Sequence, residues 1–236
     1  MAWTEHDYPD ADALTVAVAE HLRMACEAAL RAHDSALIAL AGGKTPLPIY
    51  RRLAAADGID WSRVVALPGD DRCVSREHAA SNAAGLRAAF AAAHGLRIQP
   101  LTADDGDPAA SLAQARAALA PLHDTAFDAV VLGMGEDAHT ASLFPGAEAL
   151  PAAMAENSAE DAFLVMPDPL PPEAPFPRIT LGLARLLRAR SLHLIVTGAR
   201  KREVLRAAQT THDPLRAPIS ALLHAPDAIV HVHWSP

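Results

Sequence analysis

The stretch that decides the fold reads Phe127-Asp128-Ala129-Val130-Val131-Leu132, followed at once by Gly133-Met134-Gly135-Glu136-Asp137-Ala138-His139. A short apolar run that ends at a glycine predicts a buried strand of a parallel sheet. In open α/β sheets, ligands bind beyond the carboxyl ends of the strands. The polar loop after Gly133 is therefore the first place where we expect a functional site.

Outward from this strand, predicted helices and strands alternate along the chain. Apolar residues recur at helical spacing from Asp12 onward, at Leu14, Val18, Leu22, Cys26 and Leu30. Further helices are predicted through 50–53, 86–90, 112–119, 183–187 and 204–205, and strands at 36–41, 64–67, near 98, at 127–132, 192–196 and 229–233. Strands separated by helices predict an α/β fold, a three-layer αβα arrangement with a mostly parallel, Rossmann-like sheet.

A single domain over residues 1–236 is expected. The chain is 51% hydrophobic, which is enough to bury a substantial core. We find no internal repeat, and the proline-rich stretch 167–177 lies between elements of the same kind. We interpret that stretch as a loop over one domain.

Charge and composition limit which binding partners and which cellular compartment we expect for this protein. A formal net charge of −8 argues against nucleic-acid binding, which needs clustered Lys and Arg. Cys26 and Cys73 lie far apart and form no disulfide framework, so a reducing compartment fits best. Residues 1–7 contain early acids and no basic segment leading into an apolar run, so neither a signal peptide nor a membrane span is predicted. We expect a cytoplasmic protein without nucleic-acid or membrane partners.

The segment Ala41-Gly42-Gly43-Lys44-Thr45-Pro46 follows one predicted strand and precedes a predicted helix. Paired glycines let the backbone approach an anion, Thr45 offers a hydroxyl, and a helix start presents unpaired N–H groups to a phosphate. A phosphate cradle is one interpretation, and a tight turn that needs glycine only for its backbone angles is the other. The Walker A nucleotide motif is rejected, because Ile38 stands where that motif requires glycine.

Cations recur after other predicted strands. Asp70-Asp71-Arg72 suits a site in which Arg72 meets an anion while the acids fix its orientation, and a solvated salt bridge in a turn is the alternative. Arg178, in the segment 177–180, and Lys201, after the strand at 192–196, can reach a phosphate or a developing oxyanion. Ordinary solvated cations are the alternative for both.

Asp137 and His139 form the best candidate for catalysis. In an extended segment, a spacing of two residues points both side chains the same way. A carboxylate beside an imidazole fixes its tautomer and raises its basicity, so the free nitrogen can take a proton from water attacking a carbonyl. With 12 histidines in the chain, a structural role is the alternative.

Three other features lack support as reactive sites. Ser142 has no Gly-x-Ser-x-Gly elbow, so we expect capping or packing. Nothing pairs Cys73 with a base, and a small buried side chain is expected there. His231 and His233 share one face of the last predicted strand, but the sequence reveals no third ligand, so no metal site is expected.

Taken in order, these motifs resemble the bacterial 6-phosphogluconolactonase family over essentially the whole chain. The resemblance rests on residues 42–46, 70–72, His78, Ser81-Asn82, 133–145, 177–180, Lys201 and 232–234. It implies a three-layer α/β fold shared with glucosamine-6-phosphate deaminases and ribose-5-phosphate isomerases. It also implies a reaction that uses neither metal nor organic cofactor, and a monomer.

The resemblance implies hydrolysis of a small sugar-phosphate lactone, 6-phospho-D-glucono-1,5-lactone, by direct water attack. His139 would be the general base, Asp137 would orient it, and Arg72 would be a catalytic cation. Substrate binding is implied for Gly42, Gly43, Lys44, Thr45, Asp70, Asn82, Arg178 and Lys201.

This chain departs from the family pattern in three places. Asp71 stands for the usual glutamate, and Cys73 stands for an aromatic residue. Ala138 replaces the expected glycine between the aspartate and the histidine. If that position needs a positive φ, alanine costs on the order of 1 kcal/mol in strain.

Two other functions remain open at this point. One is a glucosamine-6-phosphate deaminase or sugar-phosphate isomerase on the same fold. The deaminase family has a motif similar to Gly-His-Ile-Ala-Phe-Asn-Glu at this place, whereas residues 138–144 of this chain are Ala-His-Thr-Ala-Ser-Leu-Phe. The other is a non-catalytic sugar-phosphate sensor. A regulator of that kind is expected to carry a basic DNA-binding helix pair, and the N-terminal region is acidic.

Overall fold

The computed structural model describes residues 3–168, 170 and 174–236. Within these residues, seven strands form one sheet in the order β1-β10-β9-β6-β2-β3-β5, and all neighbours are parallel. The strands are β1 (Trp3–Asp7), β2 (Ala36–Leu40), β3 (Val64–Pro68), β5 (Arg97–Ile98), β6 (Ala129–Gly133), β9 (Leu192–Thr197) and β10 (Val230–Ser235). The predicted α/β fold with a mostly parallel sheet is confirmed.

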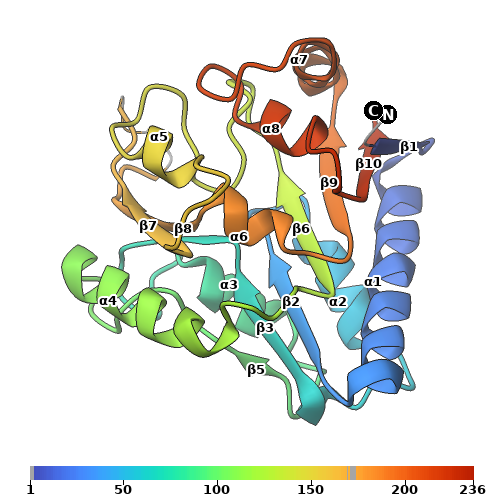
Figure 1. The fold of residues 1–236 in the computed structure, drawn as a ribbon. Coiled ribbons are helices and arrows are strands. Elements are labelled where there is room, and N and C mark those ends of the chain that lie inside the picture. The colour runs from blue at the N-terminus through green and yellow to red at the C-terminus, as the bar shows by residue number, and fades with distance from the viewer. Residues whose placement is uncertain (1–2, 169, 171–173) are drawn as a thin grey trace.

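Helices cover both faces of this sheet (Figure 1). One face packs against α1 (Ala11–His33), α2 (Leu47–Ala54) and α3 (Asn82–Ala89). The other packs against α4 (Pro108–Leu119), α5 (Leu150–Ala153), α6 (Leu183–Leu187), α7 (Ala199–Thr210) and α8 (Ile219–Leu223). Along β2, Ile38 and Leu40 enter the first cluster, whereas Leu37 and Ala39 enter the second. This alternation explains the continuous apolar run, because both faces of the strand are buried.

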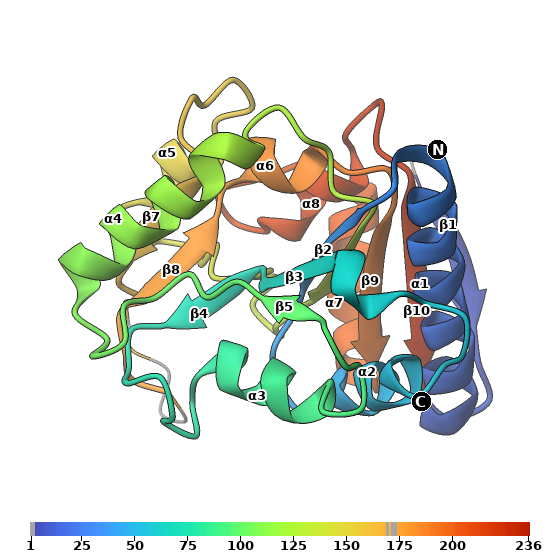
Figure 2. The ribbon, with the colours of Figure 1, turned by 90° about the horizontal axis from the view of Figure 1, so that it is seen from below.

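A second, antiparallel sheet was not predicted. It contains β4 (Asp70–Arg72), β8 (Arg178–Leu181) and β7 (Ala162–Val165), in the order β4-β8-β7. Figure 2 shows α4 packed beside β7 and β8, on the far side of the molecule from α1. The second sheet holds Arg72 and Arg178 as register partners on adjacent strands.

The boundaries of the main elements follow local chemistry. The Asp10 carboxylate accepts a hydrogen bond from Ala13 N and caps the start of α1. Strand β6 begins at Ala129, two residues later than predicted, and Phe127 makes only an isolated bridge to Ala189. Within the described residues, no helix is both long enough and apolar enough to cross a membrane. The loop predicted at 167–177 lies partly outside the described residues.

Candidate active site

A pocket of about 330 Å³ lies where β2, β6 and β9 end. Its lining includes ten of the predicted site residues: Gly42, Gly43, Lys44, Thr45, Asp70, Arg72, Asn82, His139, Arg178 and Lys201. Further lining residues are Ala41, Pro46, Gly133, Met134, Gly135, Ala141, Ile195 and Thr197. The fold therefore gathers residues from distant parts of the chain at one edge of the sheet, as expected for an open α/β sheet.

Asp137 lies behind His139 and holds its ring. The imidazole Nδ1 and Asp137 Oδ1 are 2.6 Å apart, and the same oxygen accepts the His139 backbone N–H at 3.2 Å. Burial acts to raise the pKa of Asp137, but the hydrogen bonds and charge of His139 outweigh it and leave that pKa lowered. With Nδ1 occupied, Nε2 is the nitrogen left to exchange a proton.

The two residues meet through a turn, which corrects the prediction of an extended segment. Ala138 has φ 63°, and Ala138 N donates to Gly135 O at 3.1 Å. Ala138 therefore has the positive φ considered above, a left-handed conformation that glycine would adopt without cost. A second hydrogen bond closes the turn: Gly135 N donates to His139 O at 2.9 Å.

Gly135 lies directly beneath the Asp137–His139 pair. A Cβ atom built at Gly135 would lie 2.2 Å from His139 Nδ1 and 2.4 Å from Asp137 Oδ1. No side chain fits there without moving the pair. This close approach explains a glycine at a position whose φ is not in the left-handed region.

Arg72 and Arg178 form a pair of cations on β4 and β8. Arg72 Nη1 donates to Ala80 O at 2.9 Å and to Asn82 Oδ1 at 2.8 Å, while Arg178 Nη2 donates to Ala174 O at 3.1 Å. The Nε atoms of both arginines are buried and lack a hydrogen-bond partner among the described residues. Burial lowers the pKa of Arg178, and the charge of Arg72 lowers it further. Both features suit a bound anion.

Arg72 is oriented by Asn82, not by the neighbouring acids as predicted. Asn82 Nδ2 in turn donates to Asp70 O at 2.7 Å, and Asp70 Oδ2 accepts from Ser142 Oγ. The solvated salt-bridge alternative is wrong, because Asp70 is only 7% exposed. Ser142 is fully buried, which agrees with the predicted packing role, and its hydrogen bond to Asp70 was not predicted.

Asp71 faces away from the pocket and caps α3. Its carboxylate is fully buried and accepts from the backbone N–H groups of Arg72, Asn82 and Ala83 at 2.8, 2.6 and 2.9 Å. Burial raises its pKa in spite of these hydrogen bonds. Asp71 in place of the family's usual glutamate therefore affects how the backbone of Arg72 and Asn82 is held.

The glycine turn and Lys201 complete the pocket. Gly43 has φ 94°, which a glycine adopts freely. Helix α2 begins at Leu47, after Pro46, so the turn 42–45 precedes the helix as predicted. Lys201 lies in the first turn of α7, which follows β9.

Phe144 is a residue whose role the sequence did not reveal. Its ring lies 4.3 Å from the His139 ring, and the Arg178 guanidinium lies 5.0 Å from its centroid. Phe144 therefore packs against both the base and one cation. The sequence feature that could have indicated Phe144 is its position within the 133–145 motif. Cys73 is buried, and burial raises its pKa to about 11, so the thiol interpretation finds no support.

The chain is similar to known proteins over nearly its whole length. Residues 9–234 match the family described as glucosamine-6-phosphate isomerases/6-phosphogluconolactonase. The chain belongs to this family. A 6-phosphogluconolactonase from Pseudomonas putida is 35% identical over 239 residues, which cover 98% of this chain and 92% of that protein.

Solved structures of the family share the fold. A 6-phosphogluconolactonase from Shewanella baltica superposes with a TM-score of 0.89 at 29% identity, covering 99% of this chain and 97% of that one. A monomeric glucosamine-6-phosphate deaminase superposes with a TM-score of 0.78 at 18% identity, covering 98% and 97%. The likeness to the deaminase is one of fold alone.

Proposed function

We propose that this member of the family hydrolyses 6-phospho-D-glucono-1,5-lactone to 6-phospho-D-gluconate, the second step of the oxidative pentose phosphate pathway. One structural observation supports this proposal. His139, with Nδ1 held by Asp137, opens onto a pocket that also contains Arg72, Arg178 and Lys201. A positioned base beside clustered cations suits water attack on the carbonyl of an anionic ester.

In this mechanism, His139 Nε2 removes a proton from water as the water oxygen attacks C1 of the lactone. The surrounding positive charge stabilises the oxyanion that forms. The C1–ring oxygen bond then breaks, and the imidazolium returns the proton to the departing ring oxygen. Asp137 stabilises the imidazolium between the two transfers, and its lowered pKa keeps it ionised.

The cations bind the anionic substrate. Arg72 and Arg178 offer buried guanidinium groups, while Lys44 and Lys201 offer ammonium groups from two other elements. Asn82 and Asp70 act as positioning residues, because Asn82 Oδ1 accepts from Arg72 and Asn82 Nδ2 donates to Asp70. We further propose that the protein is a cytoplasmic monomer formed by one domain over residues 1–236.

The test compares His139→Ala with His94→Gln, a change at an exposed histidine outside the pocket. Loss of the base should lower kcat by roughly 10²–10⁴-fold, with little change in KM. Lactone is generated in situ, and the spontaneous rate is subtracted. A His139→Ala variant that keeps most of its activity would contradict the mechanism. Ammonia release from glucosamine 6-phosphate, without lactone turnover, would contradict the substrate.

A further inference from the structure

Five histidines gather on the face of the main sheet that α1 covers. His6 lies on β1, His193 on β9, His231 and His233 on β10, and His21 on α1. The lining of the active-site pocket contains other residues. The lactonase mechanism therefore does not account for this cluster.

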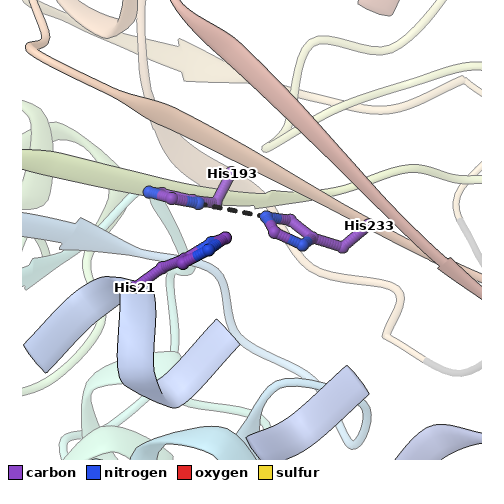
Figure 3. Close-up of side chains that lie close together, drawn as sticks. All are labelled: His21, His193 and His233. Carbon is purple, nitrogen blue, oxygen red and sulfur yellow. Dashed lines mark hydrogen bonds between the residues drawn. The ribbon is translucent and has the colours of Figure 1, made fainter. Parts of the chain in front are cut away.

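His21, His193 and His233 bring three nitrogen atoms to one point. One ligand atom from each ring lies within 4.8 Å of the other two. Figure 3 shows His193 and His233 meeting from neighbouring strands while His21 rises toward them from the helix. His193 Nδ1 and His233 Nε2 are 3.1 Å apart. Two nitrogens bound to zinc at about 2.0–2.1 Å with tetrahedral angles are about 3.3 Å apart.

One nitrogen of His21 is unpaired within the described part of the chain. His21 Nδ1 is buried and has no hydrogen-bond partner among the described residues. An unpaired buried polar atom costs free energy unless a ligand satisfies it. A metal ion at the meeting point of the three rings would satisfy this nitrogen.

The outer nitrogens of the two strand histidines are already held. His193 Nε2 lies 3.2 Å from Ser191 Oγ, and His233 Nδ1 lies 2.9 Å from Tyr8 Oη. In the structure the inner nitrogens, His193 Nδ1 and His233 Nε2, share a hydrogen bond, so one of them carries a proton. An ion would replace this hydrogen bond: with that proton on the outer nitrogen, both rings donate an N–H to a hydroxyl oxygen and both inner lone pairs face the ion. Metal-binding histidines are oriented in this way in known sites.

A surface pocket borders two of the three proposed ligands, His21 and His193. A pocket of about 180 Å³ is lined by His21, Met24, Ser191, His193 and His231. Burial lowers the pKa of His193 to about 3 and that of His233 to about 2, so both rings are neutral at neutral pH. Neutral imidazole is the form that binds zinc-type ions.

We propose that His21, His193 and His233 bind one divalent transition-metal ion, of which zinc is the best match. Three imidazoles leave a further coordination position, which water fills. The ion joins α1 to β9 and β10, so its role is structural. The sequence showed no third ligand beside His231 and His233, because the remaining ligands come from elements far away in the chain.

The test uses tag-free protein treated with EDTA, dialysed and then titrated with zinc chloride. We expect one zinc ion per chain and, at about 100 times Kd, a rise of roughly 5–10 °C in Tm. Cobalt chloride should give the visible absorption of a tetrahedral site. Magnesium chloride, which prefers oxygen ligands, should have no effect.

A matched pair of variants tests the ligand assignment. His21→Asn keeps a neutral side chain of similar reach but offers a poor ligand, so zinc affinity should fall at least ~100-fold. His21→Asp places a carboxylate oxygen near the position of Nδ1 and should restore most of the binding. His94→Gln should bind zinc like the parent protein.

Three results would overturn the proposal. They are an absence of zinc binding, an affinity unchanged in His21→Asn, and binding lost in His139→Ala instead, which would put the ion in the active site. If His21→Asn does not fold, X-ray absorption of the zinc-loaded parent protein decides. It should reveal three imidazole nitrogens at about 2.0 Å, and a different ligand set would contradict the proposal.

Discussion

Gly135 has no side chain because the Asp137–His139 pair occupies the space where one would lie. Single residues such as Gly135 determine how precisely the His139 ring is placed in the site. His139 touches Asp137, Gly135 and Phe144, and each of these contacts fixes one aspect of its position.

Substituting Gly135 with alanine should damage catalysis more than folding. The new Cβ would push His139 and Asp137 apart or away from the pocket, and a displacement near 1 Å costs about 10²-fold in rate. We expect kcat to fall by roughly that factor while circular dichroism remains unchanged. Gly69→Ala is the matched control, since its Cβ would meet no described atom within 4 Å. Equal activity of the two variants would contradict this account.

The sequence predicted ten residues that line the pocket and the contact of Asp137 with His139, but not the other contacts of the site. The motifs located the pocket residues, because polar side chains after strand ends meet at one edge. The left-handed turn at Ala138 and the use of Asn82 to hold Arg72 depend on tertiary contacts. No local pattern in the sequence encodes them.

At the scale of elements, the buried strands and the short edge strand β5 were predicted, whereas the edge strand β1 and the strands of the second sheet were not. Strands β2, β6 and β9 have continuous apolar runs, whereas β1 reads Trp-Thr-Glu-His-Asp and β4 reads Asp-Asp-Arg. These polar strands form because neighbouring strands offer hydrogen bonds and a register, which overrides local propensity. Strand β4 of the second sheet was missed for the same reason, whereas β7 and β8 span only four residues each.

The junction of β4 and α3 depends on one carboxylate. In Asp71→Ala, the buried N–H groups of Asn82 and Ala83 lose their acceptor, so unfolding should become easier by about 3 kcal/mol. Urea denaturation measures this loss. Asp57→Ala, at an exposed acid, should stay within about 0.5 kcal/mol of the parent protein. KM for the lactone should also rise in Asp71→Ala, because Asn82 supports Arg72.

The packing of α1 on β9 and β10 should make the metal-free protein sensitive to mild acid. Burial lowers the pKa of His193 to about 3 and that of His233 to about 2, below the unfolded value of about 6.5. The unfolded chain therefore binds protons first, and the stabilisation present above pH 6.5 is lost as pH falls toward the folded values.

Between pH 7.5 and 5.5 these two rings should together cost about 2–3 kcal/mol of stability. Urea denaturation in EDTA at several pH values tests this expectation. The groups facing them are His6, His21, His231 and Tyr8, and the pKa of His21 and His231 is lowered as well. Equal stability at both pH values would contradict the expected burial.

At the scale of the whole molecule, the two hydrophobic clusters share one sheet. Residues of β2 enter both clusters, so the two helix layers pack against opposite faces of the same strands. Loss of either layer would expose one face of strands on which the other cluster also depends. We therefore expect the chain to unfold in one cooperative step, as a single domain does.

Tryptophans on the two sides test this directly. Trp61 belongs to the cluster beside α1–α3, whereas Trp3 and Trp234 pack against the other cluster. A Trp61→Phe variant and a Trp3→Phe/Trp234→Phe variant each report one side by fluorescence. Within each variant, the fluorescence midpoint should coincide with that from circular dichroism. Separate transitions would mean that the two sides unfold independently.

The pairing of β1 with β10 joins two segments that lie far apart in time as well as in sequence. Residue 7 emerges from the ribosome more than 220 residues before residue 230, a delay of roughly 10–45 s at typical translation rates. During that interval β1 has no partner strand, and α1 lacks the contacts that it makes with β10. We therefore expect nascent chains that end before β10 to expose apolar surface of α1 and to be cleaved by proteases more readily than the full-length chain.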